Sequence, residues 1–267
     1  MTTLASATLA LAKVLTYWRG GTSTGGSTTT LVDTARTEPA DYWNDGTIWF
    51  TSGNNSGKST AILDWALTTW TFTFATQSGA CAATNTYFVA PPDFPRDVLI
   101  ESINAAQRAI GNIPQEDVTL TTVEDQEDYT LPAGVYNVKE IYIATSTTSP
   151  YSYVLASGGD WEEQATSGEI RFRTGREPGN TGYLMRLIYE APLSDVTTDT
   201  GTITAYINLE RLTWEAAVCA LEWKLKAHQE VESRFWEDQL KLAMIKREEA
   251  RRKWPIPKVN RMPRYSL

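Results

Sequence analysis

Histidine, cysteine and long hydrophobic runs are scarce in this sequence of 267 residues. The single histidine, His228, gives little support to histidine-based catalysis or to a metal site built from several histidines. The two cysteines, Cys81 and Cys219, are too few for a disulfide framework and lack the spacing of a metal motif. We expect two buried thiols, although a disulfide between them stays open. These shortages predict a protein without a metal ion or another cofactor.

No stretch of the sequence is long and apolar enough to cross a bilayer. Residues 2–18 are rich in alanine and leucine, but no basic segment precedes them and Lys13 interrupts them. They therefore make a poor signal peptide. We instead predict a helix over residues 4–17, and we expect no association with a membrane.

Positive charge is scarce in most of the chain and concentrated at its end. The net charge at pH 7 is −8. Residues 246–267 hold eight Lys or Arg and two Glu, a net +6, which leaves −14 for the other 245 residues. An acidic body repels nucleic acid, whereas a cationic tail suits an acidic surface.

Glycine, serine, threonine and aromatic residues are abundant, which favours β structure in the first third of the chain. Residues 20–30 have the composition of a flexible linker. Alternation of β-branched and aromatic residues then predicts strands at 29–32, 47–51, 59–65, 70–74 and 86–90. Trp43, Trp49, Trp65 and Trp70 can fill the core of one small sheet. We predict an N-terminal domain over residues 1–92, made of a helix and a β-rich module.

A proline-rich segment, residues 91–95, separates this module from a second predicted domain, residues 93–253. An apolar period of 3.6 residues predicts a helix over about 96–110, and a second helical block occupies about 208–253. Strand patterns lie between them, at residues 118–123, 128–131, 135–144, 151–155, 169–172, 183–189 and 202–205. The predicted fold class is therefore α+β, with a helical second domain that carries an inserted antiparallel β region.

The last segment, residues 254–267, has no helical period, because Pro255, Pro257 and Pro263 keep it extended. Apolar anchors and basic side chains are interspersed along it: Trp254, Ile256, Lys258, Val259, Arg261, Met262, Arg264 and Tyr265. One interpretation is a solvated terminus. The other is an arm that becomes ordered on a partner. We favour the arm, because disordered tails are usually poor in apolar residues.

Residues 52–60 resemble a phosphate-binding loop, since Gly57, Lys58 and Ser59 match its second half. The first glycine that the motif requires is replaced by Ser52, and the sequence after Thr60 is patterned as a strand instead of a helix. A polar hairpin loop explains the same residues. We predict that this segment is a false nucleotide site, that Lys58 is not catalytic, and that the chain has no catalytic residues.

Several stretches resemble virion proteins of tailed bacteriophages. Residues 30–34 and 41–53 are similar to a small β module of phage structural proteins, in which Gly57 and Lys58 turn a hairpin. Residues 95–104, beginning Pro95-Arg96-Asp97-Val98, resemble the first helix of head-to-tail adaptor, or neck and connector, proteins. Residues 128–135 are similar to the sheet insertion of such adaptors, and the late helices with their basic tail complete the likeness.

This resemblance implies a structural virion protein and an adaptor-type helical domain. Family adaptors form homo-oligomeric rings, commonly of twelve copies, beneath the portal protein. Their C-terminal arms reach into the portal, further neck or tail proteins attach to them, and DNA passes through the lumen without sequence-specific binding. The implied location is the phage neck, after synthesis in the host cytoplasm.

Other functions stay open at this level. Within the virion, the chain could be another neck, tail-completion or capsid decoration protein. Among binding modules, an aromatic-rich carbohydrate- or receptor-binding β domain would expose the tryptophans of residues 43–70. Among enzymes, a nucleoside triphosphatase would use Lys58. Ring size, neck layer, host and the role of the N-terminal module are not determined by the sequence.

Overall fold

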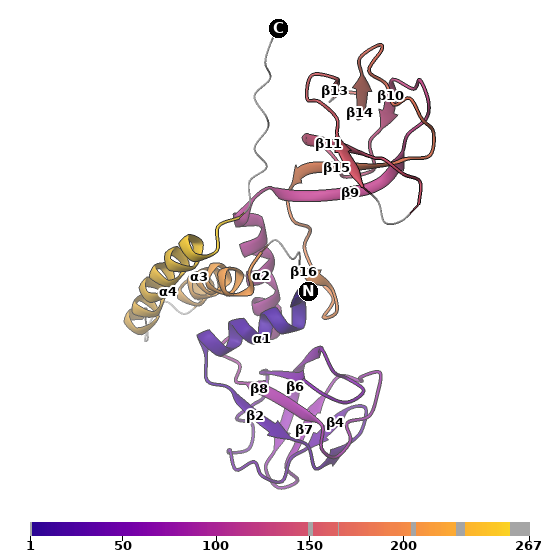
Figure 1. Ribbon diagram of the computed structural model, residues 1–267. Helices are drawn as coiled ribbons and strands as arrows, with labels where there is room; N and C mark the ends of the chain where they lie inside the picture. The colour runs from indigo at the N-terminus through magenta and orange to yellow at the C-terminus, as the bar shows by residue number, and fades with distance from the viewer. Residues whose placement is uncertain (1, 149–151, 165, 204–206, 228–232, 257–267) are drawn as a thin grey trace. The chain divides into compact units, whose positions relative to one another are not determined.

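The computed structural model describes residues 2–148, 152–164, 166–203, 207–227 and 233–256 (Figure 1). These residues group into two compact units. The first combines Met1–Ala109 with Ser194–Pro255, and the second is formed by Ile110–Leu193. The domain boundaries predicted near residues 92 and 253 stay predictions.

A small closed β-barrel occupies the N-terminal part of the first unit. Its strands are β2 (Arg19–Thr22), β3 (Gly25–Gly26), β4 (Thr30–Val32), β5 (Thr47–Phe50), β6 (Lys58–Ala66), β7 (Thr71–Phe74) and β8 (Thr86–Ala90). Antiparallel hydrogen bonding joins them in the order β2-β8-β5-β6-β7-β4-β3. Only Ser23 and Thr24 separate β2 from β3, so the two ends of this order are continuous and the sheet closes on itself.

The flexible linker predicted over residues 20–30 is therefore wrong, because β2 and β3 lie within it. Two of its glycines, Gly21 and Gly26, serve close packing. A Cβ atom at Gly21 would lie 2.6 Å from side-chain atoms of both Asp33 and Tyr87. Gly26 has a φ of +152°, and a Cβ atom there would lie 2.3 Å from the carbonyl oxygen of Thr30. Only glycine lets the backbone approach its neighbours this closely.

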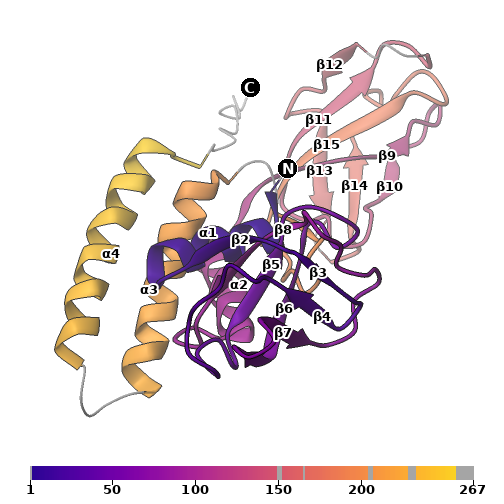
Figure 2. The same ribbon diagram turned by 90° about the horizontal axis from the view of Figure 1, so that it is seen from below.

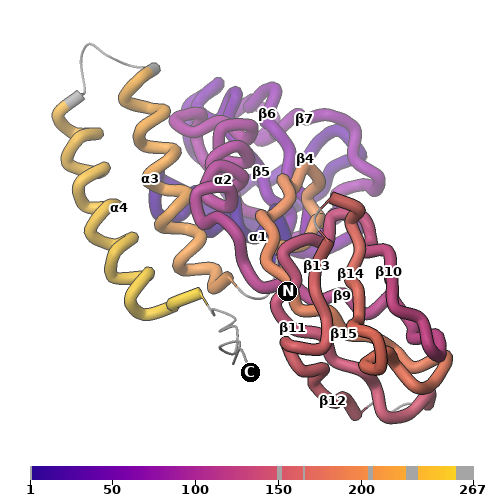
Figure 3. The backbone as a smooth tube through the Cα atoms, turned by 90° about the horizontal axis from the view of Figure 1, so that it is seen from above, coloured from indigo at the N-terminus to yellow at the C-terminus, as the bar shows by residue number. Residues whose placement is uncertain are grey.

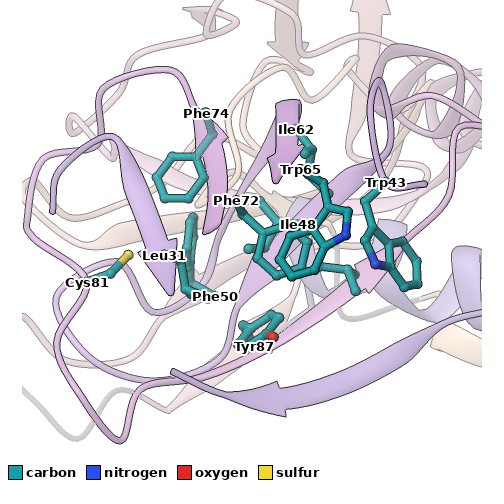
Figure 4. Close-up of a cluster of buried hydrophobic side chains, with 11 residues drawn as sticks. Leu31, Trp43, Ile48, Phe50, Ile62, Trp65, Phe72, Phe74, Cys81 and Tyr87 are labelled. Atoms are coloured by element: carbon teal, nitrogen blue, oxygen red, sulfur yellow. The ribbon is translucent and has the colours of Figure 1, made fainter. Parts of the chain in front are cut away.

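Large aromatic side chains fill the barrel (Figure 4). The ring centroids of Trp65 and Phe72 are 4.4 Å apart, and those of Phe50 and Phe74 are 5.3 Å apart. These contacts follow from the period-2 pattern of the strands, which turns every second residue inward. The predicted strands at 47–51, 59–65, 70–74 and 86–90 are confirmed, and every observed bound lies within one residue of the predicted one.

A buried polar cluster lies against this aromatic core. The hydroxyl of Tyr87 donates to Asp33 Oδ2 at 2.5 Å and accepts from Arg36 Nε at 2.9 Å. Arg36 also donates to the carbonyl oxygen of Gly20 at 3.1 Å and to Glu38 Oε1 at 3.3 Å. Asp33, Arg36 and Tyr87 are all buried. Burial raises the pKa of the Tyr87 hydroxyl, so the group stays protonated and keeps its donor role.

The helical part of the first unit contains α1 (Leu4–Leu15), α2 (Arg96–Ile110), α3 (Leu209–Ala227) and α4 (Ser233–Lys253). Figures 2 and 3 show α3 and α4 side by side, and α1 packs against α3. Thr3 caps α1, and β1 (Thr2–Thr3) pairs with β16 (Thr202–Ile203). The barrel contacts α1 through Trp49, whose buried indole N–H donates to Thr8 Oγ1 at 3.1 Å.

The second unit consists of two antiparallel sheets. One has the order β12-β11-β15-β9, with β9 (Ile113–Thr121), β11 (Val138–Ala144), β12 (Tyr153–Leu155) and β15 (Leu184–Ala191). The other has the order β10-β14-β13, with β10 (Asp128–Thr130), β13 (Trp161–Gln164) and β14 (Glu169–Phe172). Side chains of both sheets share one core: Tyr129, Val135, Val138, Ile141, Trp161, Ile170, Phe172, Met185 and Leu187.

The predicted fold class is wrong in its central feature. The described residues form mostly β structure, sixteen strands in four sheets with four helices, and the predicted helical adaptor domain is not seen. Residues 96–110 do form a helix, but α2, α3 and α4 belong to one unit with α1 and the barrel. These helices do not form a domain of their own, because α1 packs against α3 and also accepts a hydrogen bond from Trp49 of the barrel.

We predict that Tyr87→Phe lowers the free energy of unfolding by about 1–3 kcal/mol, because it leaves buried Asp33 and Arg36 without a shared partner. Tyr42→Phe is the matched control, since Tyr42 is exposed, and it should change stability by less than about 0.5 kcal/mol. Denaturant unfolding followed by tryptophan fluorescence measures both. Equal stabilities for the two variants would contradict a stabilising role for the cluster.

Candidate functional site

The segment that resembles a phosphate-binding loop is the turn of a β-hairpin. It connects β5 to β6, which are antiparallel neighbours with Phe50 opposite Lys58. Gly57 has a φ of +77°, the left-handed conformation that a tight turn needs, and Lys58 begins β6. The Lys58 ammonium donates to the hydroxyl of Ser78. A strand thus stands where a phosphate-binding loop opens a helix, as the sequence pattern after Thr60 predicted.

Ser59 has a structural partner in place of a magnesium ion. Its backbone N–H donates to Asp199 Oδ2 at 3.0 Å, and its hydroxyl donates to Asp199 Oδ1 at 2.7 Å. Arg96, at the start of α2, donates to the Ser59 hydroxyl at 3.0 Å and to Asp199 Oδ1 at 2.9 Å. These bonds tie the barrel to α2 and to the segment that precedes β16. No sequence pattern predicted this cluster, because its three residues are far apart in the chain and Asp199 stands in an ordinary turn motif.

The tryptophans predicted for the barrel separate into two groups. Trp43, Trp49 and Trp65 are buried, whereas Trp70 is 40% exposed at a turn. A ligand that stacks on an aromatic platform needs several exposed rings. The burial of three of these four side chains favours a core role over the carbohydrate-binding alternative.

No group of three His, Cys, Asp or Glu side chains is placed to hold a metal ion within the described ranges. Cys81 and Cys219 are free thiols, and desolvation by burial raises the pKa of each. His228 lies outside the described residues. In the part of the chain that is described, no helix is both long and apolar enough for a membrane span.

The predicted C-terminal arm is described only at its base. Trp254 and Ile256 are placed, whereas Lys258, Val259, Arg261, Met262, Arg264 and Tyr265 lie outside the described residues. Trp254 is 38% exposed, yet its indole N–H and its carbonyl oxygen are both engaged by α3. Its indole N–H donates to Glu210 Oε2 at 2.8 Å, and its carbonyl oxygen accepts from Arg211 at 2.9 Å. Lys253 pairs with the same Glu210 oxygen at 2.7 Å.

A protein family matches most of this chain. The family described as SU10 adaptor protein matches residues 62–262, about three quarters of the chain. The matched region begins inside the barrel, contains the whole second unit and ends in the C-terminal segment. A search of curated proteins found no match.

The contacts of Lys58 and Ser59 predict that substitutions at these two neighbouring residues differ in their effect on stability. Ser59→Ala should lower the free energy of unfolding by about 1–3 kcal/mol, because it removes a partly buried hydrogen bond to a carboxylate. Lys58→Ala should change it by less than about 0.5 kcal/mol, since it removes a surface contact. Magnesium-ATP should not raise the melting temperature of the wild type. Stabilisation by magnesium-ATP that Lys58→Ala abolishes would instead establish a nucleotide site.

Proposed function

The chain belongs to the SU10 adaptor protein family, and on that premise we propose that it forms a ring between the portal and the tail of a tailed bacteriophage. The resemblance to phage head-to-tail adaptors is thereby confirmed. A member of this family is a structural phage protein that associates with other head and tail proteins in the virion. The family match over residues 62–262 is the observation that carries the proposal.

The proposed ring surrounds a channel through which DNA passes. The net charge of −14 outside residues 246–267 supports this role. Phosphate groups bind to Lys and Arg with a strength that depends on salt, and such contacts would retard the passage of DNA. An acidic surface repels the same phosphates, so the DNA can slide without sequence-specific binding. The ring is proposed to contain twelve copies, as family adaptors commonly do.

The proposed partner on the side of the ring that faces the phage head is the portal protein, which the C-terminal arm would contact. Apolar residues between prolines lose less conformational entropy when they dock, because each proline has a restricted φ angle before binding. Lys258, Arg261 and Arg264 would face acidic groups of the portal. Each copy contributes one arm, so that weak single contacts add up by avidity.

We also propose that the protein has no enzymatic activity. Two structural features support this. Ser59, the candidate magnesium ligand of the phosphate-loop interpretation, donates its hydroxyl to Asp199. Lys58 belongs to a β-hairpin and contacts Ser78. Both side chains therefore have structural roles that account for their presence.

A protein that ends at Ile256 tests the proposed arm. The contacts of Trp254 with α3 stay in this variant, so the described part should keep its fold. Electron microscopy should show the same rings for the truncated and the full-length protein. Heads that carry a portal but lack the adaptor should accept the full-length protein at least about a hundredfold better, because many arms act together. Equal attachment of both forms would contradict portal docking through the arm.

A variant with neutral tail residues serves as the control for charge. Lys258→Gln, Arg261→Gln and Arg264→Gln together keep the length and the prolines of the arm. We expect attachment to fall less than in the truncated protein and to lose its dependence on salt, since screening acts on the charged contacts. Retained salt dependence in this variant would assign the electrostatic contact to another part of the chain.

A further inference from the structure

The base of the C-terminal arm is held by two residues of another helix. Glu210 and Arg211 stand in the first turn of α3, whereas Trp254 follows the last residue of α4. Figures 2 and 3 show these ends of the two helices next to each other. Glu210 binds the indole of Trp254 and the ammonium of Lys253, and Arg211 binds the carbonyl oxygen of Trp254. We call Glu210, Arg211, Lys253 and Trp254 the arm clasp.

The arm clasp rests on a second layer of charged contacts between the same helices. Arg251 makes two hydrogen bonds to the carboxylate of Glu215, at 2.6 and 2.8 Å, and the Glu215 side chain is only 3% exposed. Arg211 approaches that carboxylate at 3.9 Å, and its own side chain is 13% exposed. Two parallel bonds between a guanidinium and a carboxylate define a geometry as well as an attraction. The helix ends that carry the clasp are thus held in register.

The clasp also determines how the chain continues. The backbone N–H of Trp254 donates to the carbonyl oxygen of Ala250 at 2.9 Å, which completes the last turn of α4. Its carbonyl oxygen is bound by Arg211, so both ends of this residue are constrained. Pro255 follows, and its ring fixes the next φ angle near −65°. The direction in which the chain leaves α4 is therefore defined through Pro255.

We propose that Glu210 and Arg211 are positioning residues that set the exit of the C-terminal arm, and that Trp254 is its intramolecular anchor. This inference rests on the proposed portal-docking function. It divides the arm into an anchor at Trp254 and a docking segment that begins at Ile256. An arm held at its base has fewer conformations to lose when it binds, so each docking event is stronger than for a free tail.

Tryptic cleavage of the isolated protein tests the clasp without any partner. Cleavage after Lys253 requires local opening of the last turn, which the clasp opposes. We expect Glu210→Ala and Arg211→Met to accelerate cleavage of the Lys253–Trp254 bond about tenfold. Cleavage of the Lys258–Val259 bond in the same molecules is the internal reference. Glu222→Ala, which removes an exposed glutamate nearer the other end of α3, is the matched control and should leave the rate unchanged.

Attachment to portal-bearing heads tests the positioning role. Glu210→Ala and Arg211→Met should form the same oligomers and show the same circular dichroism as the wild type. They should require about tenfold more protein for half-maximal attachment, the size expected when one further residue must be ordered on docking. Trp254→Phe keeps an aromatic side chain but loses the indole N–H that binds Glu210. Its attachment defect should therefore be smaller than that of Glu210→Ala or Arg211→Met.

The two measurements separate failure of this inference from failure of the proposed function. Unchanged cleavage after Lys253 in both variants would show that the clasp does not hold the arm. Faster cleavage with normal attachment would overturn the positioning role, and the proposed function would stand if truncation after Ile256 still blocked attachment. Normal attachment of the truncated protein would overturn the portal-docking arm and this inference together.

Discussion

The carboxylate of Asp199 is the contact on which the organisation of the first unit depends. Its two oxygens bind Ser59 of the barrel and Arg96 at the start of α2, and its backbone oxygen accepts from Ala5 at the start of α1. The polar groups that it joins are partly buried, so water does not replace their partners without loss. The chain leaves this unit after Ala109 and returns at Ser194. Asp199 therefore connects the returning segment to the parts of the unit that precede the second unit in sequence.

Charge is distributed unevenly along the last helix and the segment that follows it. Several cations of α4 have acidic partners on α3 or on α4 itself: Arg251 binds Glu215, Lys253 binds Glu210 and Lys246 binds Glu249. The sequence after Trp254 has Lys258, Arg261 and Arg264 but no Asp or Glu. The positive charge that the sequence concentrates at residues 246–267 thus serves two purposes. Part of it holds the helix pair together, and the rest is available to the partner of the proposed arm.

Single helices and strands were predicted well where the apolar residues of a segment followed one clear period, either 3.6 or 2 residues. The helix at Arg96–Ile110 and the strand at Glu169–Phe172 were predicted with the observed bounds. Glycine-rich sequence misled the prediction in the first unit, because residues 20–30 were interpreted as a flexible linker. Glycine composition does not distinguish a mobile linker from a strand that packs against bulky side chains. At Gly21 the distinction depends on tertiary contacts, because side-chain atoms of Asp33 and Tyr87 occupy the space that a Cβ atom would need.

The sequence by itself determined the periods of the strands and helices, the acidic body with its basic end, and the strand pattern that follows the phosphate-loop-like motif, since all of these depend on neighbouring residues. It also carried enough resemblance to identify the family. Only the tertiary structure decided that the sheet around Trp65 closes into a barrel, that the helices share a unit with it, and that Glu210 and Arg211 hold Trp254. Those features depend on contacts between residues far apart in the chain, which no local period records.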